Sequence, residues 1–172
     1  YDTVTVASYD HEGNREGVFV SLAGNSLYPI QKPDLAYNRA RNEFLVVWQQ
    51  QVYTGGSSQD KDVYGRRVKM SGGMDYLGDP FAISDDANEE MNPAVTALPN
   101  AGSDGRYLVV FAYDNGSSHA LRGQAVEGTG TLDFFVTFPY GASSDPQRRP
   151  AVAASESAEM YLVTWQQEGY LP

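Results

Sequence analysis

The chain has 172 residues, and its formal net charge of −10 comes from 22 acidic and 12 basic side chains. Nucleic acids and anionic membrane surfaces are bound through basic patches, so this charge argues against both as partners. The chain contains no cysteine, which excludes disulfides, zinc–thiolate sites and thiol catalysis. No stretch approaches the roughly 20 apolar residues of a membrane helix, so membrane insertion is not expected.

The first part of the chain, residues 1–32, is interpreted as the second half of a structural repeat. Strands are predicted at about residues 3–7 and 18–22, with a plain turn at residues 10–14 between them. Val6 and Phe19 are 13 residues apart, as are Val68 and Phe81. This spacing places residues 3–7 level with residues 64–68 of the next repeat.

Residues 33–90 read as a complete repeat with strands at about 34–37, 43–50, 62–70 and 81–84. The second of these contains Phe44-Leu45-Val46-Val47-Trp48, in which the residues on both faces of the strand are apolar. A strand of this kind is expected to be buried on both faces. A long polar loop is predicted at residues 51–61.

Residues 91–148 repeat this order, and residues 149–172 hold the first two strands of a further repeat. The apolar stretch returns at residues 107–111 and again at 161–165. Upstream of the three copies stand Pro33, Pro93 and Pro150, which are 60 and 57 residues apart. A repeat of about 60 residues therefore decides the architecture.

Four antiparallel strands per repeat, with a doubly buried second strand, are typical of a β-propeller blade. We therefore predict an all-β fold of propeller-like, four-stranded antiparallel blades, about three blades' worth, that starts and ends in mid-blade. The divisions are residues 1–32 (second half of a blade), 33–90 and 91–148 (complete blades) and 149–172 (first half of a blade). A repeat of this length is too short for an immunoglobulin-like sandwich of ~100 residues.

Closure of the ring is the open question, because propellers usually contain about 4–8 blades. A closed ring of three blades is expected to be strained. Either the chain is a segment of a longer propeller, or two copies assemble head to tail into six blades. In both cases the half-blades find partners, since proteins avoid unpaired sheet edges.

The order of motifs resembles that of large bacterial secreted or cell-surface proteins. In those proteins "LVVW…DIYGQR" units recur as predicted propeller blades, and here the units are Phe44-Leu45-Val46-Val47-Trp48 and Asp62-Val63-Tyr64-Gly65-Arg66-Arg67-Val68. The resemblance covers nearly the whole chain and implies an extracellular or cell-surface location. It specifies the repeat type but no activity. The second repeat departs from the pattern, because Phe111 replaces the tryptophan.

In propeller geometry, the loops from strand two to strand three and from strand four to the next blade lie on one face. Such loops on a rigid scaffold commonly carry binding residues. The candidate binding residues on this long-loop face are Tyr53, Asp60, Asp85, Asp86, Glu89, Asp114, Asn115 and His119. They suit calcium, which takes several oxygen ligands, or a glycan. The alternative is a solvated acidic surface with no metal or other cofactor.

Catalysis has little support in the sequence. A glycosidase needs two carboxylates some 5–9 Å apart, and the sequence alone cannot place such a pair. The two histidines, His11 and His119, lie in different predicted turns, so a hydrolase triad or histidine metal site is not expected. No phosphate-binding loop or dinucleotide fingerprint is present. No catalytic or metal-binding residue is therefore assigned.

Several further residues fit roles in the scaffold. We interpret Trp48 and Trp165 as core residues rather than sugar platforms. Arg66, Arg67 and Arg122 are interpreted as paired charges on strand surfaces. Gly65 and Gly123 are interpreted as positions of close backbone approach between blades or of a bulge.

The sequence favours a non-catalytic extracellular module with a structural or interaction role in a secreted or surface repeat protein. Its expected partners are other protein chains or copies of itself, and surface glycans in the alternative case. The alternative is a lectin-like or calcium-dependent glycan-binding propeller. A second alternative is a fragment of a propeller-type carbohydrate-active enzyme.

Overall fold

The computed structural model describes residues 2–25, 28–53, 59–70, 74–117, 119–138 and 147–167, and these residues form β-strands and turns without a helix. The predicted all-β class is confirmed. The strands of this part of the chain are β1 (Asp2–Tyr9), β2 (Arg15–Asn25), β3 (Ile30–Asn38), β4 (Glu43–Tyr53), β5 (Gln59–Met70), β6 (Met74–Ser84), β7 (Glu89–Leu98), β8 (Arg106–Asp114), β9 (His119–Glu127), β10 (Leu132–Thr137), β11 (Gln147–Ser155) and β12 (Met160–Gln167).

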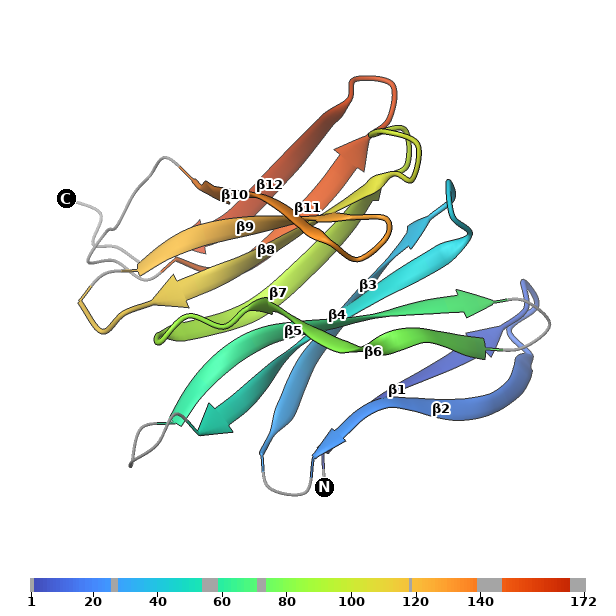
Figure 1. Ribbon diagram of the computed structural model, residues 1–172, viewed down its shortest axis with the longest axis horizontal. Coiled ribbons are helices and arrows are strands. Elements are labelled where there is room, and N and C mark those ends of the chain that lie inside the picture. Colours follow the sequence, from blue (N-terminus) through green and yellow to red (C-terminus); the bar gives the residue numbers. More distant parts are fainter. Residues whose placement is uncertain are drawn as a thin grey trace.

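Each strand pairs antiparallel with a strand that is next to it in the chain. The sheets β3–β4–β5–β6 and β7–β8–β9–β10 have four strands, and the sheets β1–β2 and β11–β12 have two. The two-stranded sheets lie at opposite ends of the molecule (Figure 1). Among the described residues, the sheets do not close into a ring.

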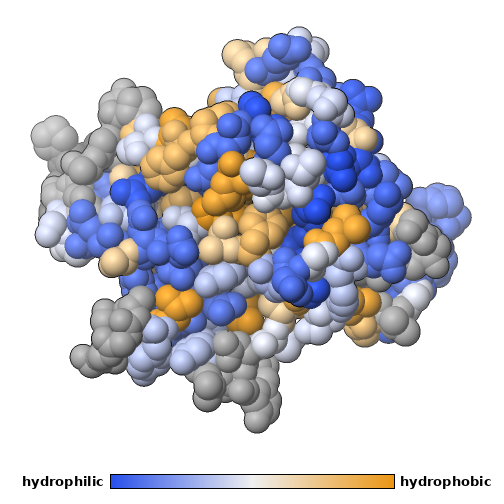
Figure 2. All heavy atoms as spheres, viewed as in Figure 1, coloured by the Kyte–Doolittle hydropathy of each residue, from blue (hydrophilic) through white to orange (hydrophobic). Residues whose placement is uncertain are grey.

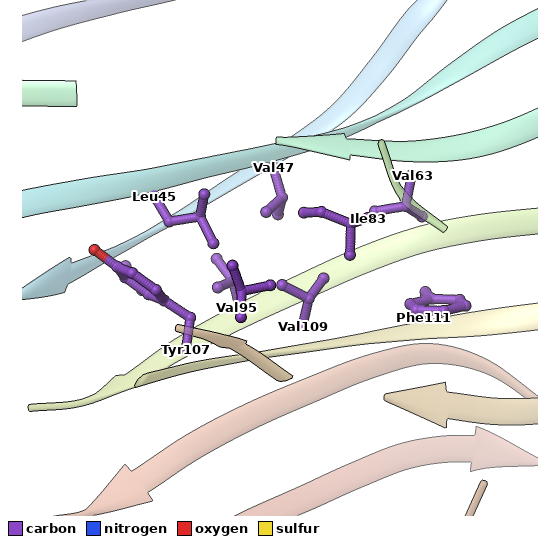
Figure 3. Close-up of a cluster of buried hydrophobic side chains, with 10 residues drawn as sticks. Leu45, Val47, Val63, Ile83, Val95, Tyr107, Val109 and Phe111 are labelled. Carbon is purple, nitrogen blue, oxygen red and sulfur yellow. The ribbon is translucent and has the colours of Figure 1, made fainter. Parts of the chain in front are cut away.

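The main core lies between the two four-stranded sheets. Leu45 and Val47 of β4 share one cluster of buried side chains with Tyr107, Val109 and Phe111 of β8 (Figure 3). All five side chains are fully buried. Burial of a large apolar side chain contributes about 1.5–3 kcal/mol, so this seam holds the two sheets together.

The opposite face of β4 is buried as well. Val46 and Trp48 pack against Val4 of β1 and Leu22 of β2 in a second core cluster. The predicted burial of this stretch on both faces is therefore confirmed, and so is the core position of Trp48, whose side chain is fully buried. The predicted core position of Trp165 is wrong in this chain, because its strand β12 is only partly covered and the Trp165 side chain is half-buried.

The first strand of each repeat contains the same backbone irregularity. The pairing register shifts at Lys32, Asn92 and Arg149, each together with the proline that follows it. The three residues have φ values of 55°, 52° and 52°. Proline has no N–H to donate to a sheet, so a bulge is one of the few strand positions that accept it.

The alignment of the first repeat differs from the expected one. Bulges follow Val4 and Val6 in the β1–β2 pair, and the corresponding bulges follow Val63 and Gly65 in the β5–β6 pair. Val4 therefore lies level with Val63, and Val6 with Gly65. The expected match of residues 3–7 with residues 64–68 is therefore wrong, because bulges alter the spacing between paired strands without changing the hydrophobic pattern.

The strands are longer than the hydrophobic pattern predicted. β4 continues to Tyr53 and β5 begins at Gln59, so part of the expected loop at residues 51–61 is strand, and residues 54–58 lie outside the described part. β6 begins at Met74 rather than at Phe81. The added strand ends mix polar and apolar residues, as in Asp75-Tyr76-Leu77-Gly78 of β6, so they lack the continuous apolar run that marks the predicted strands.

Candidate functional site

The eight candidate residues lie at or near strand ends. Tyr53 ends β4, Asp60 lies near the start of β5, Asp85 and Asp86 follow β6, Glu89 begins β7, Asp114 ends β8, Asn115 follows in the turn and His119 begins β9. In the sheet, Glu89 pairs opposite Asp114, and Asp114 pairs opposite His119. The structure therefore brings these three residues into one row across β7, β8 and β9.

Basic side chains accompany several of the candidate carboxylates. Lys61 Nζ lies 2.7 Å from Glu89 Oε1 and joins β5 to β7. His119 Nδ1 lies 3.2 Å from Asp114 Oδ2. These contacts link neighbouring strands and sheets, which is a structural role for the side chains.

A further ion pair joins the guanidinium of Arg122 to Asp86. The same guanidinium carbon lies 3.2 Å from the ring centroid of Tyr113. The predicted role of Arg122 as a paired charge is therefore confirmed.

Asp114 and Asn115 also organise the turn between β8 and β9. Asp114 Oδ1 accepts a hydrogen bond of 2.8 Å from the Gly116 N–H, and Asn115 Oδ1 accepts one of 3.0 Å from the Ser117 N–H. Side-chain acceptors of this kind bind backbone N–H groups in a turn, where the hydrogen bonds between paired strands have ended.

Tyr53 belongs to an aromatic pair. Its ring centroid lies 5.5 Å from that of Tyr28, with the rings tilted by 39°. The neighbouring residue Val52 pairs with Asp60 across β4 and β5. Tyr53 thus sits beside the acidic residues while its ring packs against a tyrosine.

The centre of the acidic region is a buried glutamate that was not among the eight candidates. Glu90 has an exposed fraction of 0%, and both of its carboxylate oxygens lack a hydrogen-bond partner. Burial raises the pKa of Glu90 to about 9, and repulsion by Asp86, Asp62 and Asp60 adds to this, whereas Arg122 acts in the opposite direction. Glu90 is therefore a neutral carboxylic acid near pH 7.

Asp62, which was also not among the candidates, behaves similarly. Its side chain is buried in β5, and burial raises its pKa to about 7, with further contributions from Asp60, Asp85 and Asp86. Burial is also the main cause of the raised pKa of Asp60. The site is thus a cluster of carboxyl groups in which burial and mutual repulsion disfavour ionisation of all the groups at once.

A comparison of repeats could have revealed Glu90. Ile30 pairs with Gln50 in the first complete repeat, and Glu90 pairs with Tyr113 at the matching place in the second. Ile30 is buried. A carboxyl group at a position that is apolar in another repeat is a signal of a buried acid.

Within the described residues, no group of three or more Asp, Glu or His side chains is arranged to hold a metal ion. The cluster can hold protons and respond to pH, and through Lys61 and Arg122 it joins β5, β7, β9 and the segment after β6.

The other two arginines differ from each other. Arg67 Nη1 lies 3.1 Å from Glu43 Oε2, as expected for a paired charge. Arg66 instead donates to the carbonyl oxygens of Gly78 and Leu22 and stacks on the ring of Tyr76. The predicted ion-pairing role of Arg66 is not seen, because its strand position faces backbone acceptors and an aromatic ring.

The expected close approach at the two strand glycines occurs within a sheet. A Cβ at Gly65 would lie 2.7 Å from Ile83 Cδ1 of β6, and one at Gly123 would lie 2.9 Å from Val136 Cγ1 of β10. The close neighbour is thus a side chain of the adjacent strand, and not the backbone of the next sheet.

Comparisons with protein-family models, with curated proteins and with solved structures each find no match. Among the described residues there is no helix of the length and apolar character needed to cross a membrane.

Proposed function

We propose that this chain is a non-catalytic structural and interaction module of a secreted or surface repeat protein, and that its sheets are successive blades of a propeller-like assembly. Its function in this proposal is to associate with further β-sheets through the exposed faces at its two ends. The extracellular location in this proposal comes from the resemblance of its repeats to those of secreted and surface proteins.

One observation carries the proposal. Leu45, Leu108 and Leu162 hold the same position in the second strands of three repeats, and their exposed fractions are 0%, 3% and 70%. Leu45 belongs to the core cluster shared with the sheet that follows in the chain, and β11 of the next sheet contacts β8, the strand that contains Leu108. This repeat position is buried in the other two copies. The high exposure of Leu162 therefore indicates a face that another sheet would cover.

Contacts between the first strands support an arrangement around a common axis. Asp34 Oδ2 of β3 accepts a hydrogen bond of 2.8 Å from the Val95 N–H of β7. The bulged segments of β3, β7 and β11 line one open hollow of about 540 Å³.

The turns at the other end of these strands also converge. Arg39, in the turn after β3, forms an ion pair with Glu156, in the turn after β11. Asn100, in the turn after β7, donates a hydrogen bond of 2.9 Å to the Glu156 carbonyl. Three sheets that share contacts at both ends of their first strands fit the inner strands of propeller blades.

A fusion protein tests whether the half-sheets are half-blades. A second copy of residues 1–25 is joined to the C-terminus through a flexible Gly/Ser linker, so that strands equivalent to β1 and β2 can complete the β11–β12 sheet. We expect a higher melting temperature than that of the parent chain, measured by circular dichroism. The control carries the same added residues in shuffled order, and equal melting temperatures for the two fusions would contradict the proposal.

Glycan binding by the long-loop face is a second candidate function, with or without calcium. The observation in its favour is the gathering of carboxyl groups around Glu90, whose oxygens lack partners. A glycan array with and without calcium, together with thermal unfolding in both conditions, tests it. Binding that is lost in a variant with Asp86→Asn and Glu89→Gln would support this candidate, and an array without signal in either condition would remove it.

A further inference from the structure

The seam between the two four-stranded sheets shows how one sheet receives another. Leu45 of β4 belongs to the same buried cluster as Val95, Tyr107, Val109 and Val126 of the following sheet. Figure 3 shows Leu45 pointing toward Val95 and Tyr107. These four residues therefore form the receptor for a leucine from the preceding second strand.

The same receptor exists on the β3–β6 sheet, where it lacks such a leucine. The repeat equivalents of the four residues are Leu35, Phe44, Val46 and Val68. All four line an apolar hollow of about 240 Å³ next to β1. Leu35 has an exposed fraction of 53%, whereas its equivalent Val95 is buried.

We propose that the β11–β12 sheet of a second copy of this chain fills this hollow. Leu162 of that copy takes the place that Leu45 takes in the internal seam. The proposal rests on the proposed function, because it names the partner that covers the exposed face.

The register of the joint follows from the internal sheets. Leu45 pairs opposite Arg67, and Val47 pairs opposite Gly65. Because Val6 lies level with Gly65, the repeat equivalents place Leu162 opposite Ser8 and Thr164 opposite Val6. β12 of one copy then pairs antiparallel with β1 of the other and completes a four-stranded sheet.

This register points the side chains of Leu162 and Thr164 to the correct face of the sheet. Val4 and Val6 already face the β3–β6 sheet of their own chain. Residues that pair directly opposite one another point to the same face of a sheet. Leu162 and Thr164 therefore point toward the hollow, whose lining includes Val6 and Ser8 of β1.

Charge and geometry favour a second copy as the occupant. β12 contains no charged side chain, and β1 contains only Asp2, so the two strands do not repel each other. β1 and β12 lie at opposite ends of the molecule (Figure 1), so one chain does not satisfy its own two ends. Two copies joined at both ends contain six four-stranded sheets, within the range of about 4–8 blades for propellers.

Light scattering on the purified chain tests the assembly. We expect a dimer near twice 18.8 kDa. Leu162→Asp and Leu35→Asp should each weaken association by about 30-fold or more, as expected for a buried anchor residue. Leu132→Asp is the matched control, because Leu132 is an exposed leucine of β10 on a different face. Figure 2 shows hydrophobic side chains gathered where β9 and β10 lie. Leu132→Asp therefore also tests whether two copies associate through this surface instead of through the hollow beside β1.

Mixing the two variants distinguishes a lost contact from a misfolded chain. The Leu162→Asp chain keeps its receptor, and the Leu35→Asp chain keeps its leucine. The mixture should therefore form a heterodimer through one intact seam, at concentrations where neither variant associates alone. Failure of the mixture to associate when both variants keep the parental circular dichroism spectrum would overturn the proposal.

Cross-linking tests the register, and the absence of native cysteine makes it specific. A Ser8→Cys chain mixed with a Leu162→Cys chain should form a disulfide-linked heterodimer under mild oxidation, since directly opposed residues have Cβ atoms within about 4.5–5.5 Å. A Ser8→Cys chain mixed with a Leu132→Cys chain should not. Equal yields from the two mixtures would contradict the register.

The outcomes separate this proposal from the proposed function. A folded monomer at all concentrations, or a dimer unchanged by Leu162→Asp, overturns the second copy as partner. If the fusion with residues 1–25 is nevertheless more stable than its shuffled control, the half-blade interpretation stands, and the partner is another chain. A third outcome is an assembly larger than a dimer that dissociates in the Leu162→Asp variant. This outcome would support the contact between β12 and β1 but would contradict a ring that closes with two copies.

Discussion

At the residue scale, Glu90 is the most unusual group in the core, because a carboxyl without hydrogen-bond partners occupies a position that is apolar in the neighbouring repeat. The pKa of Glu90 is raised to about 9 from an ordinary value near 4.5. Folding therefore favours the protonated form. The stabilising contribution is fully present below about pH 4.5 and is lost as pH rises toward 9.

Glu90→Gln keeps the shape of the protonated side chain and removes its titration. We expect the variant to become more stable than the parent as pH rises, by on the order of 2–4 kcal/mol between pH 5 and pH 9. Urea unfolding at a series of pH values measures the difference. The control is Glu89→Gln, which loses a half-exposed ion pair with Lys61 and should change stability by less than about 1 kcal/mol. A gain from Glu90→Gln that does not depend on pH would contradict the assignment.

Asp62 adds to the same pH dependence. Its pKa is raised to about 7, so its contribution is lost between its ordinary value near 3.8 and pH 7, in the same direction as that of Glu90. The parent chain should therefore be less stable at pH 9 than at pH 5.

Gly128 is a second residue whose identity is dictated by its surroundings. A Cβ at this position would lie 2.0 Å from the carbonyl oxygen of Asp104, which is backbone and cannot rotate away. The Gly128 N–H also donates to the Gly105 carbonyl at 2.9 Å. Gly128→Ala should therefore destabilise the protein by about 2–3 kcal/mol, as measured by urea unfolding.

Gly24→Ala is the control for this substitution. The nearest atom to its added Cβ would be Thr3 Cγ2 at 3.4 Å, an ordinary contact. We expect a change within about 0.5 kcal/mol. Equal losses in the two variants would mean that the clash at Gly128 does not determine the outcome.

At the scale of elements, the hydrogen bond from the Val95 N–H to Asp34 joins β3 to β7 across two sheets. Asp34→Ala removes the acceptor and should destabilise the protein by about 1–2 kcal/mol. Asp34→Asn keeps a neutral acceptor at the same place and should lose less. Thermal unfolding of both variants measures the difference, and a larger loss in Asp34→Asn than in Asp34→Ala would show that the bond does not stabilise the seam.

The strands with apolar residues at both parities could be predicted from the sequence, because double burial leaves a continuous hydrophobic run, as in β4 and β8. The alignment of β1 could not, because bulges change the register without changing composition. Glu89, Asp114 and His119 lie side by side because their strands pair in hairpins. A prediction of those hairpins from the sequence therefore also predicts that these three residues are neighbours. The burial of Glu90 depends on packing between sheets, and the contrast with Ile30 is the one sequence signal that could have indicated it.

At the scale of the whole molecule, the proposed assembly of two copies links folding to association. Dissociation exposes Leu162 and the hollow beside β1, so the associated form is stabilised by mass action. The melting temperature of the parent chain should therefore rise by several degrees over a 100-fold increase in protein concentration. The melting temperature of Leu162→Asp should not change over the same range. Scanning calorimetry measures both, and a constant melting temperature for the parent chain would contradict the linkage.

The sequential order of the strands also has a kinetic consequence. Within each sheet, strands pair only with strands that are adjacent in the chain, so every hairpin closes over a short loop and loses little loop entropy. Rates of folding rise as contacts become more local, so this protein should fold quickly for an all-β chain. Each sheet can form on the ribosome as soon as its own strands emerge, before the next sheet has been translated. The hairpins would then form first, the seams between sheets second, and the joint between two chains last, after synthesis has ended.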